Sequence, residues 1–417
     1  MKKTILLIFC LFIALSGQAQ TVTDTVSLGA GYANQLWYSL SNDEQGSAPK
    51  NNWDLAFDVS SFGSSIRINS ITGTTLWKYP NEDISGWETL DTVGLYSWES
   101  LWNSDTSWAM GAFEQHADLN NEFDLGWGYY STVTHIVSGD SLYVIQLSDG
   151  SFKKLWIESL SGGAFNFRHA NLDGSSEVLA QIVKSQFNNK NFAYYSFQDN
   201  LSFDREPVSD SWDLLFSQYT AFIPDPYTVT GVLSNKEVAV AEASNIGNTN
   251  DYNDWQAHSF VSQINEIGYD WKTFGGTGFE IADSLIYFVK DKSDDIWKLI
   301  FTGFGGSANG NFIFTKERLS SVSIYENNTG KSIASLVVYP NPAPAQQVTL
   351  VYNLEQNTTS ARLTITDIAG KTAYSESLPT TSGLKVHQPE LPPLSPGTYI
   401  VSLFIDGNVA HQKLIIQ

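Results

Sequence analysis

The sequence has 417 residues, with 44 acidic and 23 basic side chains and a formal net charge of −21. An acidic surface repels phosphate backbones, which argues against nucleic-acid binding, and the length predicts two or three domains at about 150 residues each. Charged residues make up only 16% of the chain, while 13% are aromatic and 13 residues are Trp. This composition is typical of an exported all-β protein rather than a helical enzyme.

The first twenty residues have the features of a secretory signal peptide. Lys2 and Lys3 precede an apolar run from Ile5 to Leu15, and small residues follow it. The run is too short to span a membrane, and no other long apolar stretch follows. The one cysteine, Cys10, lies inside this run, so the processed chain has no disulfide or thiolate chemistry. The sequence therefore predicts export of residues 21–417 with no transmembrane segment.

Two stretches of the chain repeat the same series of motifs. In each, an apolar strand-like motif is followed by Trp-Asp-Leu-x-Phe, and later by a strand–turn–strand pattern. The first copy contains Leu36–Leu40, Trp53–Phe57 and a predicted hairpin over 140–157, and the second contains Ala193–Phe197, Trp212–Phe216 and a predicted hairpin over 283–301. The order of parts is kept while the spacing drifts, as loops allow. The repeat predicts two copies of one β-rich unit, residues 21–185 and 186–325.

The motif Trp-Asp-Leu-x-Phe has the alternation of a β-strand. Trp, Leu and Phe are expected on one buried face, with Asp54 or Asp213 on the other face, toward water or a neighbouring loop. Because these two carboxylates match between the copies, they are also the best candidates for an acid–base pair, although capping a loop explains them as well. One helix is predicted, over residues 254–267, from its apolar spacing.

The second copy resembles the HmuY-like secreted β-proteins. The resemblance rests on Ser211–Phe216, Val229–Leu233, Val238–Ala241 and Ile267–Lys272. It implies an all-β fold, and the best-known members of that family capture haem outside the cell through paired His or Met ligands. Such a pair has no counterpart in a recognisable motif here.

Two groups of side chains are candidates for ligand binding. Imidazole is a good ligand for a metal or a haem iron, and His116, His135 and His169 can meet in space, with scattered, hydrogen-bonded histidines as the alternative. Six Trp crowd one stretch of the first copy, and exposed Trp suit stacking on a sugar or a flat apolar ligand. These are Trp77, Trp87, Trp98, Trp102, Trp108 and Trp127.

The C-terminal fifth of the chain differs in composition from the rest. No Trp follows Ser335, whereas eight of the 13 Pro do, which predicts a domain boundary near residues 325–335 with a polar linker at 326–331. The residues beyond it form short strand-like segments separated by turn signals, as in a small β-sandwich. The predicted strands are 348–354, 361–367, 372–378, 398–405 and 413–416.

Three motifs in this tail resemble the C-terminal sorting domain (type A) of type IX secretion substrates. They are Val337–Pro342, with Tyr339, Pro340, Asn341 and Pro342; Ile365–Lys371, with Gly370 and Lys371; and Leu394–Tyr399, with Pro396 and Gly397. The resemblance covers residues 335–417. It implies export across a bacterial outer membrane by the type IX secretion machinery, followed by release or by attachment to surface lipopolysaccharide.

Together these features predict an all-β chain with two HmuY-like units and a small C-terminal β-sandwich. The predicted function is that of a secreted or cell-surface binding protein, not an enzyme, with haem or a glycan as the candidate ligand. The alternatives are a surface glycan hydrolase that uses paired carboxylates and an adhesive or structural surface protein with no small ligand. No Gly-x-Ser-x-Gly or His-Glu-x-x-His motif is present in the sequence.

Overall fold

The computed structural model describes residues 21–81, 83–320, 333–341, 343–344, 347–354, 357–367, 371–406 and 408–416. The predicted signal peptide and the predicted linker lie outside these residues. The chain divides into two compact units between residues 320 and 321. Within the described ranges the units are built from strands and short 3₁₀ turns, with a single α-helical turn, α1 (Gly306–Asn309). The all-β prediction is confirmed. No helix of the described residues is both long and apolar enough to cross a membrane.

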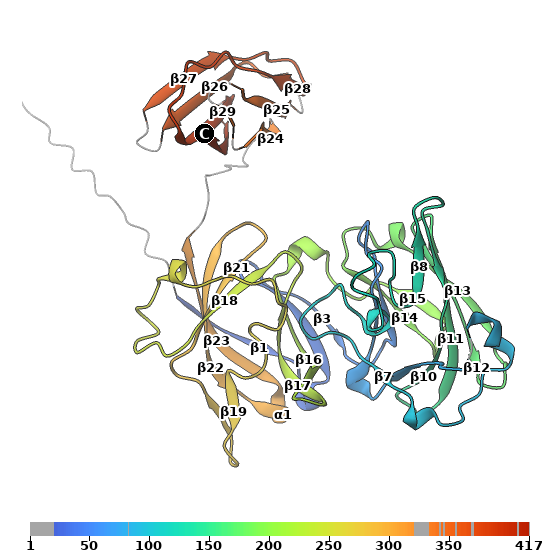
Figure 1. Ribbon diagram of the computed structural model, residues 1–417. Helices are drawn as coiled ribbons and strands as arrows, with labels where there is room; N and C mark the ends of the chain where they lie inside the picture. Colours follow the sequence, from blue (N-terminus) through green and yellow to red (C-terminus); the bar gives the residue numbers. More distant parts are fainter. Residues whose placement is uncertain are drawn as a thin grey trace, which may run out of the picture. The chain divides into compact units, whose positions relative to one another are not determined.

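The larger unit is built mainly from four antiparallel sheets, here called A to D, that form two β-sandwiches (Figure 1). Sheet A contains β1 (Val22–Ser27), β23 (Asn311–Ser320), β22 (Ile296–Phe304), β21 (Ile286–Lys290) and β18 (Ala239–Ala243). Sheet B contains β17 (Pro226–Ser234), β16 (Leu214–Phe222), β2 (Asn34–Ser39) and β3 (Asp43–Pro49). A short hairpin of β19 (Lys272–Phe274) and β20 (Phe279–Ile281) lies outside the four sheets.

The second sandwich is made of sheets C and D. Sheet C contains β15 (Leu201–Phe203), β14 (Phe192–Ser196), β4 (Leu55–Asp58) and β5 (Ile66–Ile68). Sheet D contains β13 (Val178–Val183), β12 (Ala164–Asn171), β11 (Phe152–Ser161), β10 (Leu142–Gln146), β6 (Thr75–Lys78) and β7 (Ser100–Leu101), with β9 (Ile136–Gly139) and β8 (Gly128–Ser131) joined to β11. One continuous apolar core lies between C and D, and another lies between A and B.

The two sequence copies exchange a hairpin. In sheet B the first-copy strands β2 and β3 lie beside the second-copy strands β16 and β17, and in sheet C the second-copy strands β14 and β15 lie beside the first-copy strands β4 and β5. The two pairings have the same register, because Trp37 lies opposite Leu215 and Tyr194 lies opposite Ala56. The division predicted at residues 185 and 186 therefore separates sequence copies but not sandwiches, since each sandwich takes strands from both copies.

The inner strands of sheets B and C are buried on both faces, which explains their near-continuous apolar sequences. They are β2 and β16 in sheet B, and β4 and β14 in sheet C. In β4, Leu55 and Phe57 enter the core between C and D, while Ala56 points to the opposite side. In β16, Leu214 likewise enters the core between A and B, and Leu215 points to the opposite side. These second faces of B and C look toward each other across the middle of the unit.

The Trp-Asp pair of the repeated motif precedes its strand instead of lying in it, which corrects the predicted alternation. β4 begins at Leu55 and β16 at Leu214. Since the chain turns just before each strand, Trp53 and Trp212 pack on the face opposite to that of the following Leu. Of the two surroundings predicted for the Asp side chains, water or a neighbouring loop, the structure shows the loop, as their hydrogen bonds below show.

The two predicted hairpins are confirmed, whereas the predicted helix is wrong. The hairpins are β10–β11 and β21–β22, both antiparallel. Over residues 254–267 the structure has only a 3₁₀ turn at Trp255–Ala257. Val261 forms a β-bridge with Val240, and Phe260 packs on sheet A. The backbone groups that pair with the sheet are not available for helical hydrogen bonds. The apolar residues of this segment cover sheet A, and their spacing happens to match the period of a helix.

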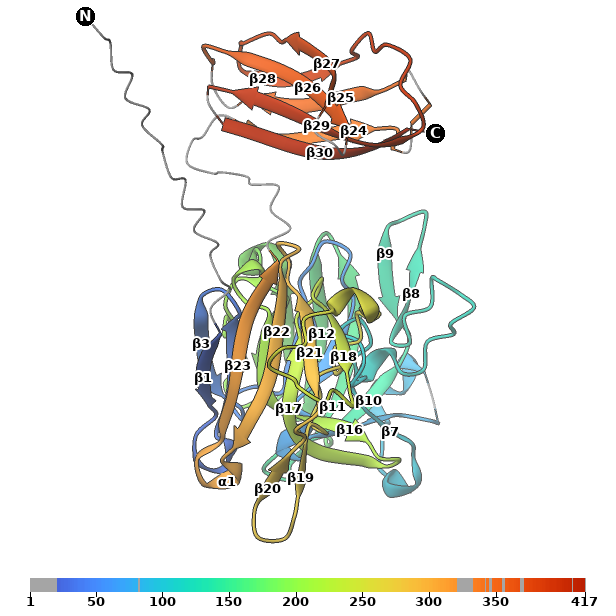
Figure 2. The same ribbon diagram turned by 90° about the vertical axis from the view of Figure 1, so that its left-hand side faces the viewer.

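The smaller unit is a β-sandwich of a three-stranded and a four-stranded sheet (Figure 2). The first sheet contains β24 (Ile333–Tyr339), β25 (Thr349–Leu354) and β28 (Gly383–His387). The second contains β27 (Thr372–Ser377), β26 (Ala361–Asp367), β29 (Gly397–Ile405) and β30 (Asn408–Ile416). The five predicted strands are confirmed, and the prediction missed β24 and β28.

Candidate functional site

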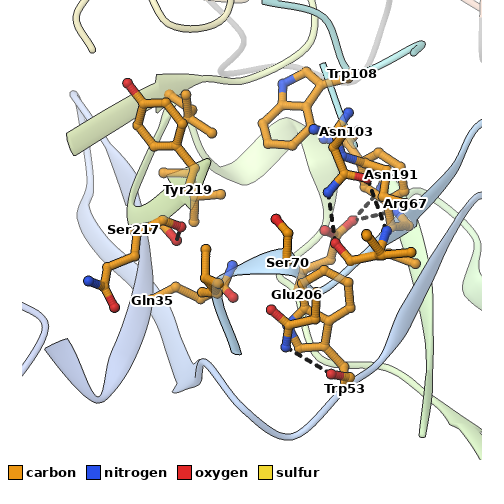
Figure 3. A pocket seen from close by; sticks show the side chains of 18 of the residues that line it. Gln35, Trp53, Arg67, Ser70, Asn103, Trp108, Asn191, Glu206, Ser217 and Tyr219 are labelled. Atoms are coloured by element: carbon orange, nitrogen blue, oxygen red, sulfur yellow. Dashed lines mark hydrogen bonds between the residues drawn. The ribbon is translucent and has the colours of Figure 1, made fainter. Parts of the chain in front are cut away.

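A cavity of about 90 Å³ lies between the facing sides of sheets B and C. In Figure 3, Gln35, Ser217 and Tyr219 lie on one side of it and Trp108, Arg67 and Asn191 lie on the other. The hydroxyl of Ser70, just after β5 of sheet C, and the hydroxyl of Thr220, on β16 of sheet B, form a hydrogen bond of 2.8 Å. Seven aromatic rings line the cavity: Trp37, Trp53, Trp108, Phe192, Tyr194, Trp212 and Tyr219.

The buried arginine of the cavity wall is held by three hydrogen bonds to backbone carbonyls. The Arg67 guanidinium donates to the backbone carbonyls of Ser104, Ser107 and Met110 at 2.8, 2.9 and 3.3 Å. It also lies 5.0 Å from the ring centroid of Trp108. Burial lowers the pKa of Arg67 to about 10. Arg67 therefore holds the loop that carries Trp108.

The buried carboxylate of the wall is engaged as well. Glu206 accepts hydrogen bonds from the backbone N–H groups of Asn191 and Phe192 and, at 2.9 Å, from the Tyr194 hydroxyl. Burial raises the pKa of Glu206 to about 7, and these hydrogen bonds oppose the rise. Both buried charged groups of the wall thus serve the scaffold.

Glu206 makes the stability of the larger unit depend on pH. Burial raises its pKa from the ordinary 4.5 to about 7, so between these values the folded state keeps a proton that the unfolded state releases. The contribution of this group is fully present below pH 4.5 and is lost as the pH rises through 7. We expect the unfolding free energy of residues 21–320, minus that of the Glu206→Gln variant, to fall by about 3 kcal/mol between pH 4.5 and 8.

Urea unfolding of both proteins at several pH values measures this difference. Glu44→Gln, an exposed substitution on β3, is the matched control and should leave the pH profile unchanged. A difference that stays constant, or that grows as the pH rises, would contradict the role assigned to Glu206.

The six predicted Trp do not form one binding surface. Trp77, Trp87 and Trp98 belong to an apolar cluster with Leu142 and Val144 of β10. Trp102 donates to the Ser100 hydroxyl at 3.0 Å, and Trp127 is fully buried in the core between C and D. Trp108 alone among the six lines the cavity between B and C.

The three predicted histidines have separate partners. His116 lies 3.5 Å from Glu99, His135 bonds the Tyr130 hydroxyl at 2.9 Å, and the buried His169 bonds the Tyr195 hydroxyl at 2.9 Å. Burial lowers the pKa of His169 to about 4. Among the residues that the structure describes, no group of three or more His, Cys, Asp or Glu is placed to hold a metal ion. None of the three histidines lines the cavity.

The repeated carboxylates Asp54 and Asp213 each hold a loop. Asp54 accepts the Phe197 N–H at 2.7 Å, and Asp213 accepts the Leu40 N–H at 2.8 Å. Each therefore fixes the residue just after an exchanged strand, β14 in one case and β2 in the other. Burial raises the pKa of Asp54, and raises that of Asp213 to about 6. Their matching positions are thus explained by the hairpin exchange.

In the smaller unit, the first tail motif is tied to the last strand. The Asn341 side chain donates to the Lys413 carbonyl at 2.7 Å and accepts the Ile415 N–H at 2.9 Å. Tyr399, next to the Pro396-Gly397 turn, donates its hydroxyl to the Ser395 carbonyl at 3.0 Å. The Lys371 N–H bonds the Asp367 carboxylate at 2.9 Å. Tyr339 is the last residue of β24, and Pro340 directly follows it. Pro342 and Gly370 lie outside the described residues.

Residues 337–417 match the family model described as the secretion system C-terminal sorting domain. The tail is a type IX secretion sorting domain. It directs the protein to the cell surface or the extracellular space, and it implies contact with the type IX secretion machinery. No curated protein is significantly similar to the chain.

Two solved structures show weak likeness to the chain. One is "Biofilm associated protein - BSP domain", with 10% identity, 97% of this chain and 67% of that chain covered, and a TM-score of 0.16. The other is Escherichia coli alpha-2-macroglobulin activated by porcine elastase, with 8% identity, 96% and 34% covered, and a TM-score of 0.15. At these TM-scores neither likeness carries an argument about the fold or the function.

Sequence reasoning missed most of the cavity. Gln35, Arg67, Glu206 and Ser217 come from four separate segments that only the exchange of hairpins brings together. One signal was available in the repeat itself: position 35 is Gln in the first copy, whereas the matching position 192 in the second copy is Phe. Gln35 directly precedes the repeated motif Leu36–Leu40, and a polar residue where the other copy has an aromatic one indicates a role outside the core.

Proposed function

We propose that the protein is a binding protein, exported by the type IX system, that takes a small ligand in the cavity between sheets B and C. The observation that carries this proposal is the composition of the cavity wall. Aromatic rings and uncharged polar groups face the cavity, and the two buried charges are already engaged by the scaffold. Ligand pockets in proteins combine an apolar lining with a few polar groups in this way.

We further propose that the larger unit is a duplicated HmuY-like body. The matching registers of the exchanged strands and the matching loop-holding roles of Asp54 and Asp213 support a duplication. Haem is nevertheless a poor fit to this cavity. A cavity of about 150 Å³ holds a benzene ring, and the cavity here measures about 90 Å³, so a haem macrocycle does not enter it.

The route of export follows from the two ends of the chain. We propose that residues 1–20 direct the chain through the inner membrane and are removed, and that the tail then directs it across the outer membrane. Release, or attachment to surface lipopolysaccharide, completes the path. Between binding and glycan hydrolysis, the separate loop-holding hydrogen bonds of Asp54 and Asp213 favour binding.

A variant that fills the cavity tests the proposal. Ser217 is 4% exposed and lines the cavity, so Ser217→Phe occupies the space a ligand needs. We expect at least one compound from a panel of haemin, amino acids, nucleosides and methyl pyranosides to raise the melting temperature of residues 21–320, by about 2–5 °C, and to leave Ser217→Phe unchanged. These shifts correspond to roughly 1 kcal/mol of ligand stabilisation.

The matched control is Thr228→Phe, an exposed substitution on the neighbouring strand β17, opposite Thr220. It should respond to ligands as the wild type does. If the wild type and Ser217→Phe respond alike to every compound, the cavity is not a binding site and the proposal fails.

A further inference from the structure

We infer that the cavity recognises a neutral, hydroxyl-bearing ring, a single terminal sugar residue of a larger glycan, and that Gln35 is the side chain that selects it. This inference rests on the proposed function and names the ligand class for the same cavity. It is carried by the position of Gln35, by its counterpart in the second copy and by the chemistry of the surrounding wall.

Gln35 is buried, faces the cavity and has no protein partner. Side chains alternate along β2, so Gln35 shares a face with Trp37, while Leu36 and Tyr38 enter the core between A and B. Gln35 is 5% exposed, and within the described residues its amide group makes no hydrogen bond to another residue. Its amide donors and acceptor are therefore free to bond a molecule in the cavity, whether water or a ligand.

The second copy shows that the fold does not require an amide at this position. Phe192 takes the place of Gln35 in the second copy, and Phe192 lies opposite Asp58 in sheet C. In sheet B, Leu36 pairs with Phe216, and the same register places Gln35 opposite Ser217. Since an aromatic ring occupies the equivalent site, packing alone accepts an apolar residue there. Phe192 lines the same cavity, so the wall presents an amide on the side of sheet B where it presents a ring on the side of sheet C.

The chemistry of the wall favours an uncharged hydroxyl compound. An amide both donates and accepts hydrogen bonds, and a hydroxyl does the same, whereas an ammonium group only donates and a carboxylate only accepts. Arg67 and Glu206 are engaged by the scaffold, which leaves Asp105 as the remaining charged side chain of the lining. The aromatic rings offer apolar contacts for the C–H groups at the edge of a pyranose.

The size of the cavity selects the end of a glycan. At about 90 Å³ it is smaller than the roughly 150 Å³ that holds benzene, so it admits the hydroxyl-bearing edge of one ring while the rest of the molecule stays outside. A residue in the middle of a glycan chain would have to pass both of its linkages through this space. A terminal residue does not.

Calorimetric titration of residues 21–320 with separate methyl pyranosides tests the inference. Tetrahydropyran serves as the ring without hydroxyls, and methylammonium and acetate serve as the charged probes. We expect at least one pyranoside to bind, the other three probes not to bind, and Gln35→Leu to weaken binding about tenfold, as the loss of one buried hydrogen bond predicts. Gln35→Leu nearly conserves volume, and its melting temperature shows whether it folds.

Gln181→Leu is the matched control, because Gln181 is an exposed amide on β13 that bonds Asn166 and does not line the cavity. Its affinity should equal that of the wild type. Equal affinity of folded Gln35→Leu and the wild type would overturn the role of Gln35. Binding of methylammonium or acetate that Ser217→Phe blocks, without pyranoside binding, would overturn the ligand class and leave the proposed function standing. If Ser217→Phe and the wild type behave alike toward all probes, both proposals fail.

Discussion

Cutting the larger unit between residues 188 and 189 is expected to leave two fragments that do not fold separately and that fold together. Residues 21–188 contain sheet D but lose β14 and β15, while residues 189–320 lose β1, β2 and β3. The first fragment thereby loses Ala193, Tyr195 and Phe197 from its core. At about 1.5–3 kcal/mol for each of the two large side chains, Tyr195 and Phe197, this loss is comparable with the lower end of the roughly 5–15 kcal/mol by which domains are stable.

Circular dichroism and urea unfolding of each fragment, and of the two mixed, measure the effect. We expect a cooperative unfolding transition only for the mixture and for intact residues 21–320. The matched control is a circular permutant that begins at residue 189 and ends at 188, with residues 320 and 21 joined by a short Gly/Ser linker. Because Val22 lies beside Lys316, such a linker spans the gap, and the permutant should fold.

A monomeric fragment 21–188 that unfolds cooperatively would mean that its β2–β3 hairpin folds back onto its own β4. The exchange seen in the intact chain would then be an option of the fold rather than a requirement. The five-residue connection 50–54 between β3 and β4 opposes such folding back of the hairpin onto β4, because β3 and β4 belong to different sheets. A short connection leaves the hairpin little freedom to reach the other side.

The strands were predictable because their signals are local. Alternation and turn residues within ten or fifteen positions indicate a hairpin such as β10–β11, and the three tail motifs lie within one small domain. The repeat was also visible, as matching motifs about 157–159 residues apart. What the repeat did not indicate is which copy of β2 pairs with which copy of β4. Equivalent strands carry equivalent apolar patterns, so both pairings satisfy the same local rules.

The cavity was not predictable for the same reason. Its wall combines a strand of one copy with a strand of the other and with the loop that carries Trp108. The high number of Trp in one stretch does not show where their side chains lie. Most of those rings cover sheet D or fill its core. The prediction of the helix at 254–267 failed through a related ambiguity, since apolar residues that cover a sheet at intervals imitate a helical face.

Deletion of residues 321–417 is expected to stop surface delivery almost completely. The tail is the sorting domain, and the larger unit forms its own compact body with its own cores. A chain that ends at Ser320 therefore keeps residues 1–20, the predicted signal peptide, and the folded unit, and loses only the domain that directs it across the outer membrane. In a host with a type IX system, we expect more than about nine-tenths of this chain to remain in the periplasm, measured by fractionation and surface proteolysis.

Two further experiments distinguish a sorting defect from a folding defect. The periplasmic truncated chain should melt at the temperature of purified residues 21–320, which excludes misfolding as the cause of retention. Asn341→Ala in the full chain removes both hydrogen bonds between the first tail motif and β30, which at about 1 kcal/mol each should destabilise the tail and reduce delivery partially. Surface delivery of the truncated chain at the level of the full chain would show that the larger unit carries its own export signal, and the tail would then act after translocation.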